Sequence, residues 1–256
     1  MTLAGFFGFF DYTKPGKGVN KDEPKKKGIL RFFELFFRKF WNYMKLNLLY
    51  MITCIPAFLF YTYILLYLFG GNVEPDLAWA MLFLAAAGAI TLITFLGGSP
   101  FAAGFNYVLR NYVREEHAWV FSDFLEHTKK NLKQSLFVFF TDLIIVTVIL
   151  FNIRFYFLAS ASNIWMTALL VLVAFLFMIF LIMHTFIWTM MVTFRLKIGQ
   201  IYRNAFLLTI LRLFRNIGGF ILIFALSLVL LTIQPIIGIL IMILIGFSMF
   251  GLINHM

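Results

Sequence analysis

The sequence contains few charged residues and almost no cysteine. Only 12% of its 256 residues are Asp, Glu, Lys or Arg, whereas ordinary soluble domains carry about a quarter. Hydrophobic residues make up 62% of the chain, and its mean hydropathy is +0.94. A water-soluble globular fold cannot bury that much apolar surface, so the composition indicates an integral membrane protein.

Residues for catalysis or metal binding are also scarce. The single cysteine, Cys54, excludes an intrachain disulfide and a cysteine cluster for zinc or iron–sulfur. The chain has no Gly-Lys-Ser/Thr phosphate loop, no His-Glu-x-x-His pair and no Gly-x-Ser-x-Gly elbow. His117 and His127 lie among acidic residues in a polar segment, which is typical of a solvated face. We therefore expect no catalytic, metal or cofactor site, and a protein that is not an enzyme.

Long apolar runs predict an all-α, polytopic bundle of transmembrane helices, because about 20 apolar residues cross a bilayer as a helix. A basic and aromatic N-terminal segment, residues 1–45, precedes a single transmembrane domain, residues 46–256. We expect about six spans if Pro235 divides the last apolar stretch into two, and five remain possible if it does not. The expected spans are residues 46–69, 77–96, 135–150, 164–194, 217–233 and 236–253.

Positive charge lies beside the apolar runs and on one side of them. The net charge is +10, and two basic loops, residues 110–133 and 195–215, fall on the same side as the N-terminus, with Arg154 on the other. Cytoplasmic loops carry such an excess of Lys and Arg. We expect a multi-pass plasma-membrane protein with a cytoplasmic N-terminus and membrane lipids as partners. Nucleic acid is not expected, because the interleaved Phe residues belong to apolar helical runs.

Aromatic residues recur at helical spacing among basic ones between Lys27 and Tyr43, which predicts an amphipathic helix there. Two interpretations stay open: a helix that docks on a partner or the membrane surface, or the amphipathic lead-in to the first span. The candidate docking residues of the three basic segments are Phe32, Phe36, Arg38, Lys39, Trp41, Lys129, Lys130, Lys133, Arg203, Arg212 and Arg215.

Ionisable residues inside predicted spans are costly and are functional candidates by default. Asp142 lies about two turns inside the third span, and His184 lies about eleven residues before Arg195, so the two side chains could meet near the middle of the membrane. They either line a substrate or proton path, or they satisfy one another between helices.

Several motifs resemble the YesL-like family, the domain of unknown function 624. They are Phe9-Phe-Asp-Tyr-Thr-Lys-Pro-Gly-Lys-Gly-Val, Phe36-Phe-Arg-Lys-Phe-Trp, Lys45-Leu-Asn-Leu-Leu-Tyr, Tyr107-Val-Leu-Arg-Asn-Tyr-Val-Arg-Glu-Glu-His and Lys129-Lys-Asn-Leu-Lys-Gln-Ser. The resemblance implies a bacterial membrane protein, often encoded beside carbohydrate ABC importers.

From that resemblance we expect a non-enzymatic accessory subunit of an oligosaccharide importer. Its partners would be the permease subunits and possibly their ATPase. A small permease with a polar midplane site and a membrane partner of a sensor kinase are the alternatives.

Overall fold

The structure, a computed structural model, describes residues 29–71, 75–161, 163–233, 238 and 240–255, and these contain helices and no strand. The predicted all-α class is therefore confirmed. In chain order the elements are α1 (Ile29–Arg38), α2 (Phe40–Phe69), α3 (Pro75–Leu96), α4 (Ala102–Val113), α5 (Val120–Ser160), α6 (Ile164–Thr193), α7 (Ile198–Leu211), α8 (Leu213–Ile233), the π-helical turn η1 (Met242–Gly246) and α10 (Phe247–His255).

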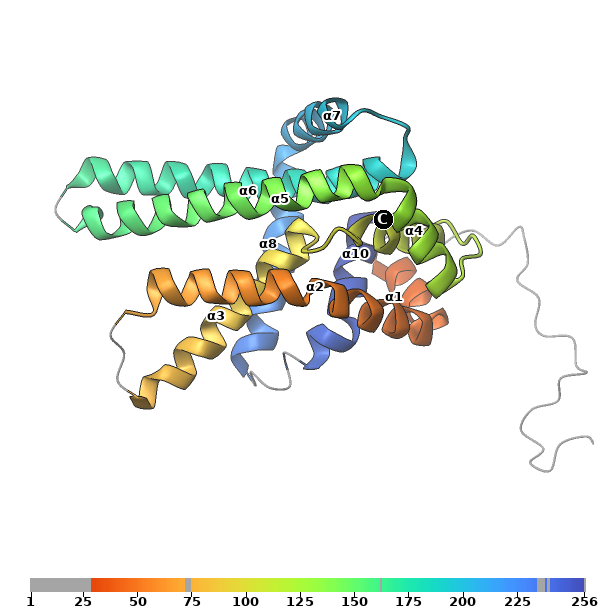
Figure 1. Cartoon of the computed structure of the whole chain (residues 1–256), viewed down its shortest axis with the longest axis horizontal. Coiled ribbons are helices and arrows are strands. Elements are labelled where there is room, and N and C mark those ends of the chain that lie inside the picture. Colours follow the sequence, from red (N-terminus) through yellow and green to blue (C-terminus); the bar gives the residue numbers. More distant parts are fainter. Residues whose placement is uncertain (1–28, 72–74, 162, 234–237, 239, 256) are drawn as a thin grey trace, which may run out of the picture.

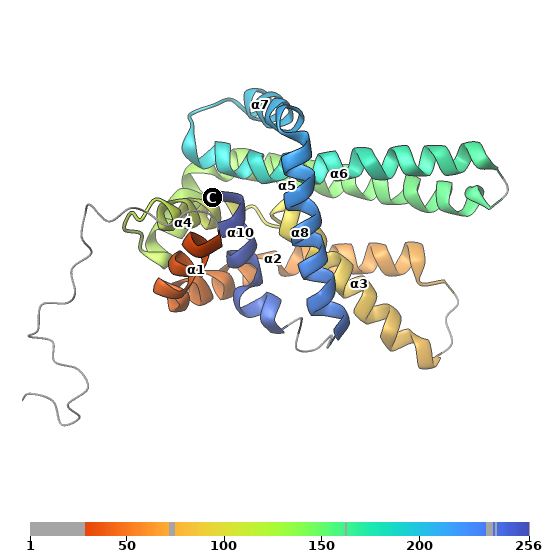
Figure 2. The same cartoon turned by 180° about the vertical axis from the view of Figure 1, so that it is seen from behind.

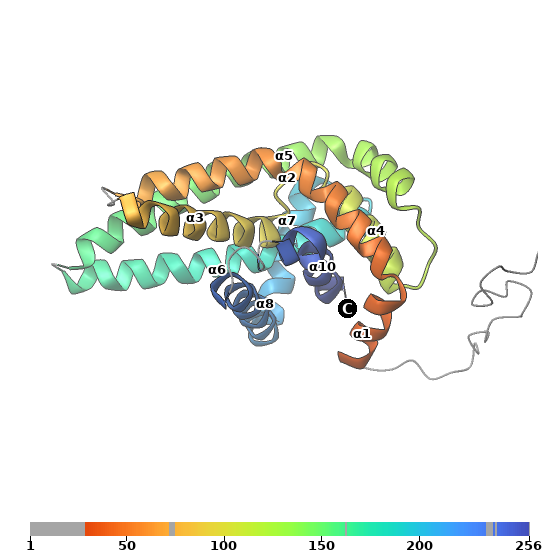
Figure 3. The same ribbon diagram turned by 90° about the horizontal axis from the view of Figure 1, so that it is seen from below.

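Two helical hairpins, α2–α3 and α5–α6, form the body of the molecule and point in the same direction (Figures 1 and 3). We call the end where α2 and α5 finish, at Phe69 and Ser160, the distal end. Helices α1, α4 and α10 gather at the other end (Figure 1). We call this the basic end, because α5 carries Lys129 and Lys133 there and Arg195 follows α6.

The four hairpin helices are each long and apolar enough to cross a membrane. α7 and α8 together make a fifth candidate only if the pair, bent by 91°, counts as one span. In Figure 2, α8 runs across α6 and α3 at a large angle instead of alongside them. The described residues thus support four or five candidate spans, where we expected about six and left five possible.

The predicted sixth span, residues 236–253, falls partly outside the described residues. Its described remainder, η1 and α10, packs against α2 and α4. The amide of Ser248 donates to the Asn47 side-chain oxygen over 2.7 Å, and the Ser248 hydroxyl donates to the Tyr43 carbonyl over 3.0 Å. These bonds hold α10 on the basic end of α2.

The first basic segment, residues 110–133, is mostly helical in the structure. α4 continues to Val113, and α5 runs without interruption from Val120 to Ser160, so only residues 114–119 connect them. Polar residues replace apolar ones before Gln134, but no Gly or Pro is present between Val120 and Gln134 to end a helix. The predicted third span, residues 135–150, is thus the middle of a helix about 60 Å long at about 1.5 Å per residue.

The predicted amphipathic helix between Lys27 and Tyr43 is divided in two. α1 ends at Arg38, Lys39 leaves helical geometry, and α2 begins at Phe40, six residues before the predicted span. Residues 1–28 lie outside the described residues. The second basic segment, residues 195–215, contains the helix α7.

The connection between α3 and α4 is fixed by side chains of other helices. Gly97 has a φ of +82°, and the indole of Trp188 lies against it, so a larger residue would be both strained and blocked. The Trp188 indole donates to the Leu96 carbonyl over 2.6 Å, and the Tyr50 hydroxyl donates to the Gly97 carbonyl. Carbonyls at the end of α3 thus find their partners on α6 and α2.

Replacing Gly104 by Ala tests the close contact of α4 with α5. A Cβ at Gly104 would overlap the Phe124 carbonyl oxygen and the Thr128 hydroxyl. We expect Gly104→Ala to lower the free energy of unfolding by about 1–3 kcal/mol, measured by thermal unfolding in detergent. Gly199→Ala in α7 is the control, since nothing lies within 4 Å of its Cβ. Equal stability of the two variants would contradict this packing.

Candidate functional site

Asp142 of α5 and His184 of α6 meet inside the bundle. Their Oδ1 and Nε2 atoms are 2.7 Å apart, and the side chains are 5% and 0% exposed. The His184 Nδ1–H donates to the Phe180 carbonyl over 2.9 Å, since a carbonyl can only accept. One proton then lies between Nε2 and Oδ1, on either atom. The pair is therefore neutral as a whole, which reduces the cost of burying it in an apolar bundle.

Two tyrosines from other helices lie near this pair. The Tyr202 ring of α7 packs edge-on against the His184 imidazole, with centroids 6.3 Å apart, and Tyr61 of α2 lies within electrostatic reach of Asp142. The Tyr202 hydroxyl is buried and has no hydrogen-bond partner. Four helices therefore converge on the pair. Sequence reasoning missed both tyrosines, because nothing in their local sequence relates α2 and α7 to Asp142.

Most of the N-terminal docking candidates make contacts within the chain. Phe36 is buried and stacks on Tyr43, with centroids 5.7 Å apart. Arg38 pairs with Glu115 at 3.4 Å, and the Lys39 ammonium donates to the Glu116 carbonyl over 3.3 Å. Burial, with a smaller effect of Arg38, lowers the pKa of Lys39, and Glu115 partly offsets this. Such contacts favour the lead-in interpretation for these residues.

The opposite face of α1 carries an exposed apolar stripe that continues onto α2. Leu30, Phe33, Phe37 and Trp41 follow one another at spacings of three or four residues, and Trp41 is 67% exposed. Phe32 is half-buried and stacks on Phe36. The remaining candidates, Arg203, Arg212 and Arg215, are exposed on and after α7.

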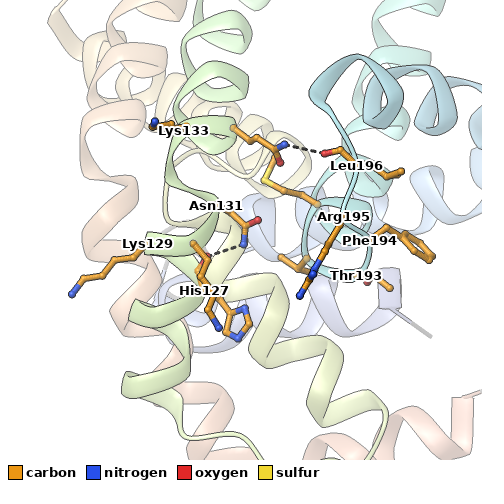
Figure 4. A pocket seen from close by; sticks show the side chains of 12 residues that line it. His127, Lys129, Asn131, Lys133, Thr193, Phe194, Arg195 and Leu196 are labelled. Atoms are coloured by element: carbon orange, nitrogen blue, oxygen red, sulfur yellow. Dashed lines mark hydrogen bonds between the residues drawn. The ribbon is translucent and has the colours of Figure 1, made fainter.

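A cleft of about 690 Å³ opens between the basic part of α5 and the α6–α7 connection. We call it the basic cleft. In Figure 4, Arg195 and His127 point toward each other across it, while Lys129 and Lys133 extend away from it. Its lining residues are His127, Lys129, Lys130, Asn131, Lys133, Gln134, Met191, Val192, Thr193, Phe194, Arg195 and Leu196.

One hydrogen bond joins the two walls of the basic cleft, and another ties one wall to α4. The Gln134 amide donates to the Leu196 carbonyl over 2.9 Å, and the Arg110 guanidinium of α4 donates to the Val192 carbonyl over 2.6 Å. Burial lowers the pKa of Arg110, with a further lowering from Arg114, but an arginine stays charged at neutral pH. The imidazole of His127 stacks on Tyr107. Arg195 was not among our candidate residues, although an arginine directly after a long apolar run is a recognisable signal.

Comparison with known proteins relates one part of the chain to a family. Residues 76–153 match the family model described as "Protein of unknown function, DUF624". The match confirms the resemblance to DUF624, and it includes the α5 wall of the basic cleft and Asp142. It does not extend to His184 or Arg195. No curated protein and no solved structure matches the chain.

A double-mutant cycle on Asp142 and His184 tests whether their bond holds α5 to α6. We expect each alanine variant to lower the free energy of unfolding by about 1–3 kcal/mol, because each leaves a buried polar partner unsatisfied. The coupling energy should be about 1 kcal/mol. Thr147→Val with Thr189→Val is the control cycle, since each hydroxyl donates only to a carbonyl of its own helix. Additive effects of the first pair would contradict the bond.

Proposed function

We propose that this protein is a non-enzymatic accessory subunit of a bacterial plasma membrane that docks beside the permease of a carbohydrate ABC importer. The DUF624 match supports the family from which this role is inferred. The four apolar hairpin helices supply the membrane anchorage that such a subunit needs. The basic end faces the cytoplasm in this proposal, because Lys and Arg are enriched on that side of membrane proteins.

The observation that carries the proposal is the contrast between a closed interior and an open basic end. Asp142 and His184 satisfy each other away from solvent. At the basic end, by contrast, Lys129, Lys133 and the Trp41 indole are exposed. Aromatic and basic side chains are the groups that protein interfaces use as anchors. This distribution favours docking over transport or catalysis by the chain itself.

A small permease is the second candidate, and one observation favours it. The single proton shared by Asp142 and His184 lies midway along α5, among the long apolar helices, where a coupled transporter would hold a proton. In that case Asp142→Asn would abolish flux and leave partner capture intact. An accessory subunit that only docks would keep its contribution to uptake after the same substitution.

Reversing one exposed charge of α5 tests the docking proposal. We expect Lys133→Glu to reduce the permease and ATPase subunits captured with the tagged protein from mild detergent by about tenfold, because a repulsive charge at an interface costs several kcal/mol. Quantitative mass spectrometry of the captured proteins provides the measurement. Lys45→Glu, at an exposed position of α2, makes the same charge change and should leave capture unaltered.

Recovery of the native protein alone, or only with copies of itself, would contradict the docking proposal. Equal capture by Lys133→Glu and the native protein would remove α5 from the interface.

A further inference from the structure

The basic cleft has the charge of an anion site. Lys129, Lys130, Lys133 and Arg195 are cationic, and none of its lining residues is acidic. Glu126 precedes Lys130 by one turn of α5, and its carboxylate pairs with the Lys130 ammonium at 2.5 Å. Arg195 and His127 are the groups that point inward (Figure 4). A guanidinium presents paired N–H groups that match the oxygens of a phosphate.

The cleft is also apolar along one side. Met191 and Val192 belong to the last turn of α6, and Phe194 follows it with 58% of its surface exposed. The apolar wall is thus continuous with a helix long and apolar enough to cross the membrane. A free inorganic anion gains no stabilisation from an apolar wall, whereas a phospholipid carries an acyl chain close to its phosphate.

The charges of α5 define the depth of the cleft in the membrane. Between Lys133 and Arg154 lie 20 residues, of which only the buried Asp142 is charged. Twenty helical residues span about 30 Å, the thickness of the hydrocarbon core. Lys133 and Arg154 therefore mark the two edges of that core. Because Lys133 lines the cleft, the cleft lies at the level of the lipid headgroups.

We propose that the basic cleft binds the phosphate of an anionic phospholipid from the leaflet at the basic end. Arg195 and His127 contact the phosphate, and the acyl chain lies along Val192 and Phe194. Basic pockets between helices at a membrane surface recognise anionic headgroups in this way. The inference stands apart from the accessory role, because it involves lipid alone and the inward-pointing residues of the cleft.

Native mass spectrometry of the purified full chain tests this site with phosphatidylglycerol and phosphatidylcholine added at equal concentration. We expect the native protein to retain phosphatidylglycerol preferentially, and Arg195→Gln to reduce that preference about tenfold, because a hydrogen bond to a charged group is lost. Lys129→Gln removes the same charge from a side chain that points away, and its effect should be about twofold through the screened field. Arg195→Lys should restore part of the preference.

Three results would overturn the proposal. One is equal retention of the two lipids, and another is an equal loss in Arg195→Gln and Lys129→Gln, which would indicate diffuse surface charge. The third is displacement of phosphatidylglycerol by millimolar inorganic phosphate in the native protein, which would identify free phosphate as the ligand. A thermal unfolding midpoint of Arg195→Gln equal to that of the native protein in phosphatidylcholine shows that the variant is folded.

The same variants distinguish a lipid from an acidic segment of a partner protein. If Arg195→Gln loses captured permease but keeps its preference for phosphatidylglycerol, the cleft binds protein, and the lipid proposal fails. If the lipid preference is lost while permease capture is unchanged, the lipid site stands without the accessory role.

Discussion

In a bundle surrounded by hydrocarbon, a polar group between the helices is costly to bury unless it finds a partner within the protein. The fold depends on that constraint. The His184 imidazole bonds to Asp142 and so ties α6 to the middle of α5, and its other nitrogen bonds to the Phe180 carbonyl of its own helix. The Trp188 indole bonds to the Leu96 carbonyl one turn further along, so α6 also holds the end of α3. Few such bonds are needed, because each one has no competition from water.

The same constraint separates the molecule into a closed part and an open part. Between Lys133 and Arg154 the outer surface of α5 is apolar, and its one charged residue is buried. The part of α5 that precedes Lys133 is polar and extends into the region of α1, α4 and α10 (Figure 1). Water and lipid headgroups can satisfy polar groups there, so charges need not be paired internally. The basic cleft and the apolar stripe of α1 occur in this part, where ligands can reach them.

The length of the apolar runs predicted the bounds of a helix correctly where a residue that starts or ends helices flanks the run. Residues 77–96 and 164–194 are close to α3 and α6, because Gly97 follows the first and Asn163 caps the second. The same reasoning failed for α5, since a change from apolar to polar residues does not end a helix. The position of α10 depends on a bond between Ser248 and Asn47, 201 residues apart, and no local pattern contains that information.

Some contacts of the candidate site could be predicted from the sequence, and others could not. Equal depth along two neighbouring spans was enough to predict that Asp142 and His184 could meet, because a hairpin aligns residues at the same distance from its turn. Local pattern could not show that Phe36 would stack on Tyr43 and leave Trp41 exposed. Both faces of α1 are aromatic, and the packing of α1 against α2 and α10 decides which face is covered.

The neutrality of the Asp142–His184 pair bears on which function the interior can serve. A transport site must alternate between access to water and enclosure, so its polar groups have to exchange partners during each cycle. His184 is fully buried and both of its nitrogens are bonded. Exposure of His184 would break the bond to Asp142 that joins α6 to α5 and the bond to Phe180 within α6, each being worth about 1 kcal/mol. A subunit that only docks never requires that step, and the pair then contributes to stability throughout.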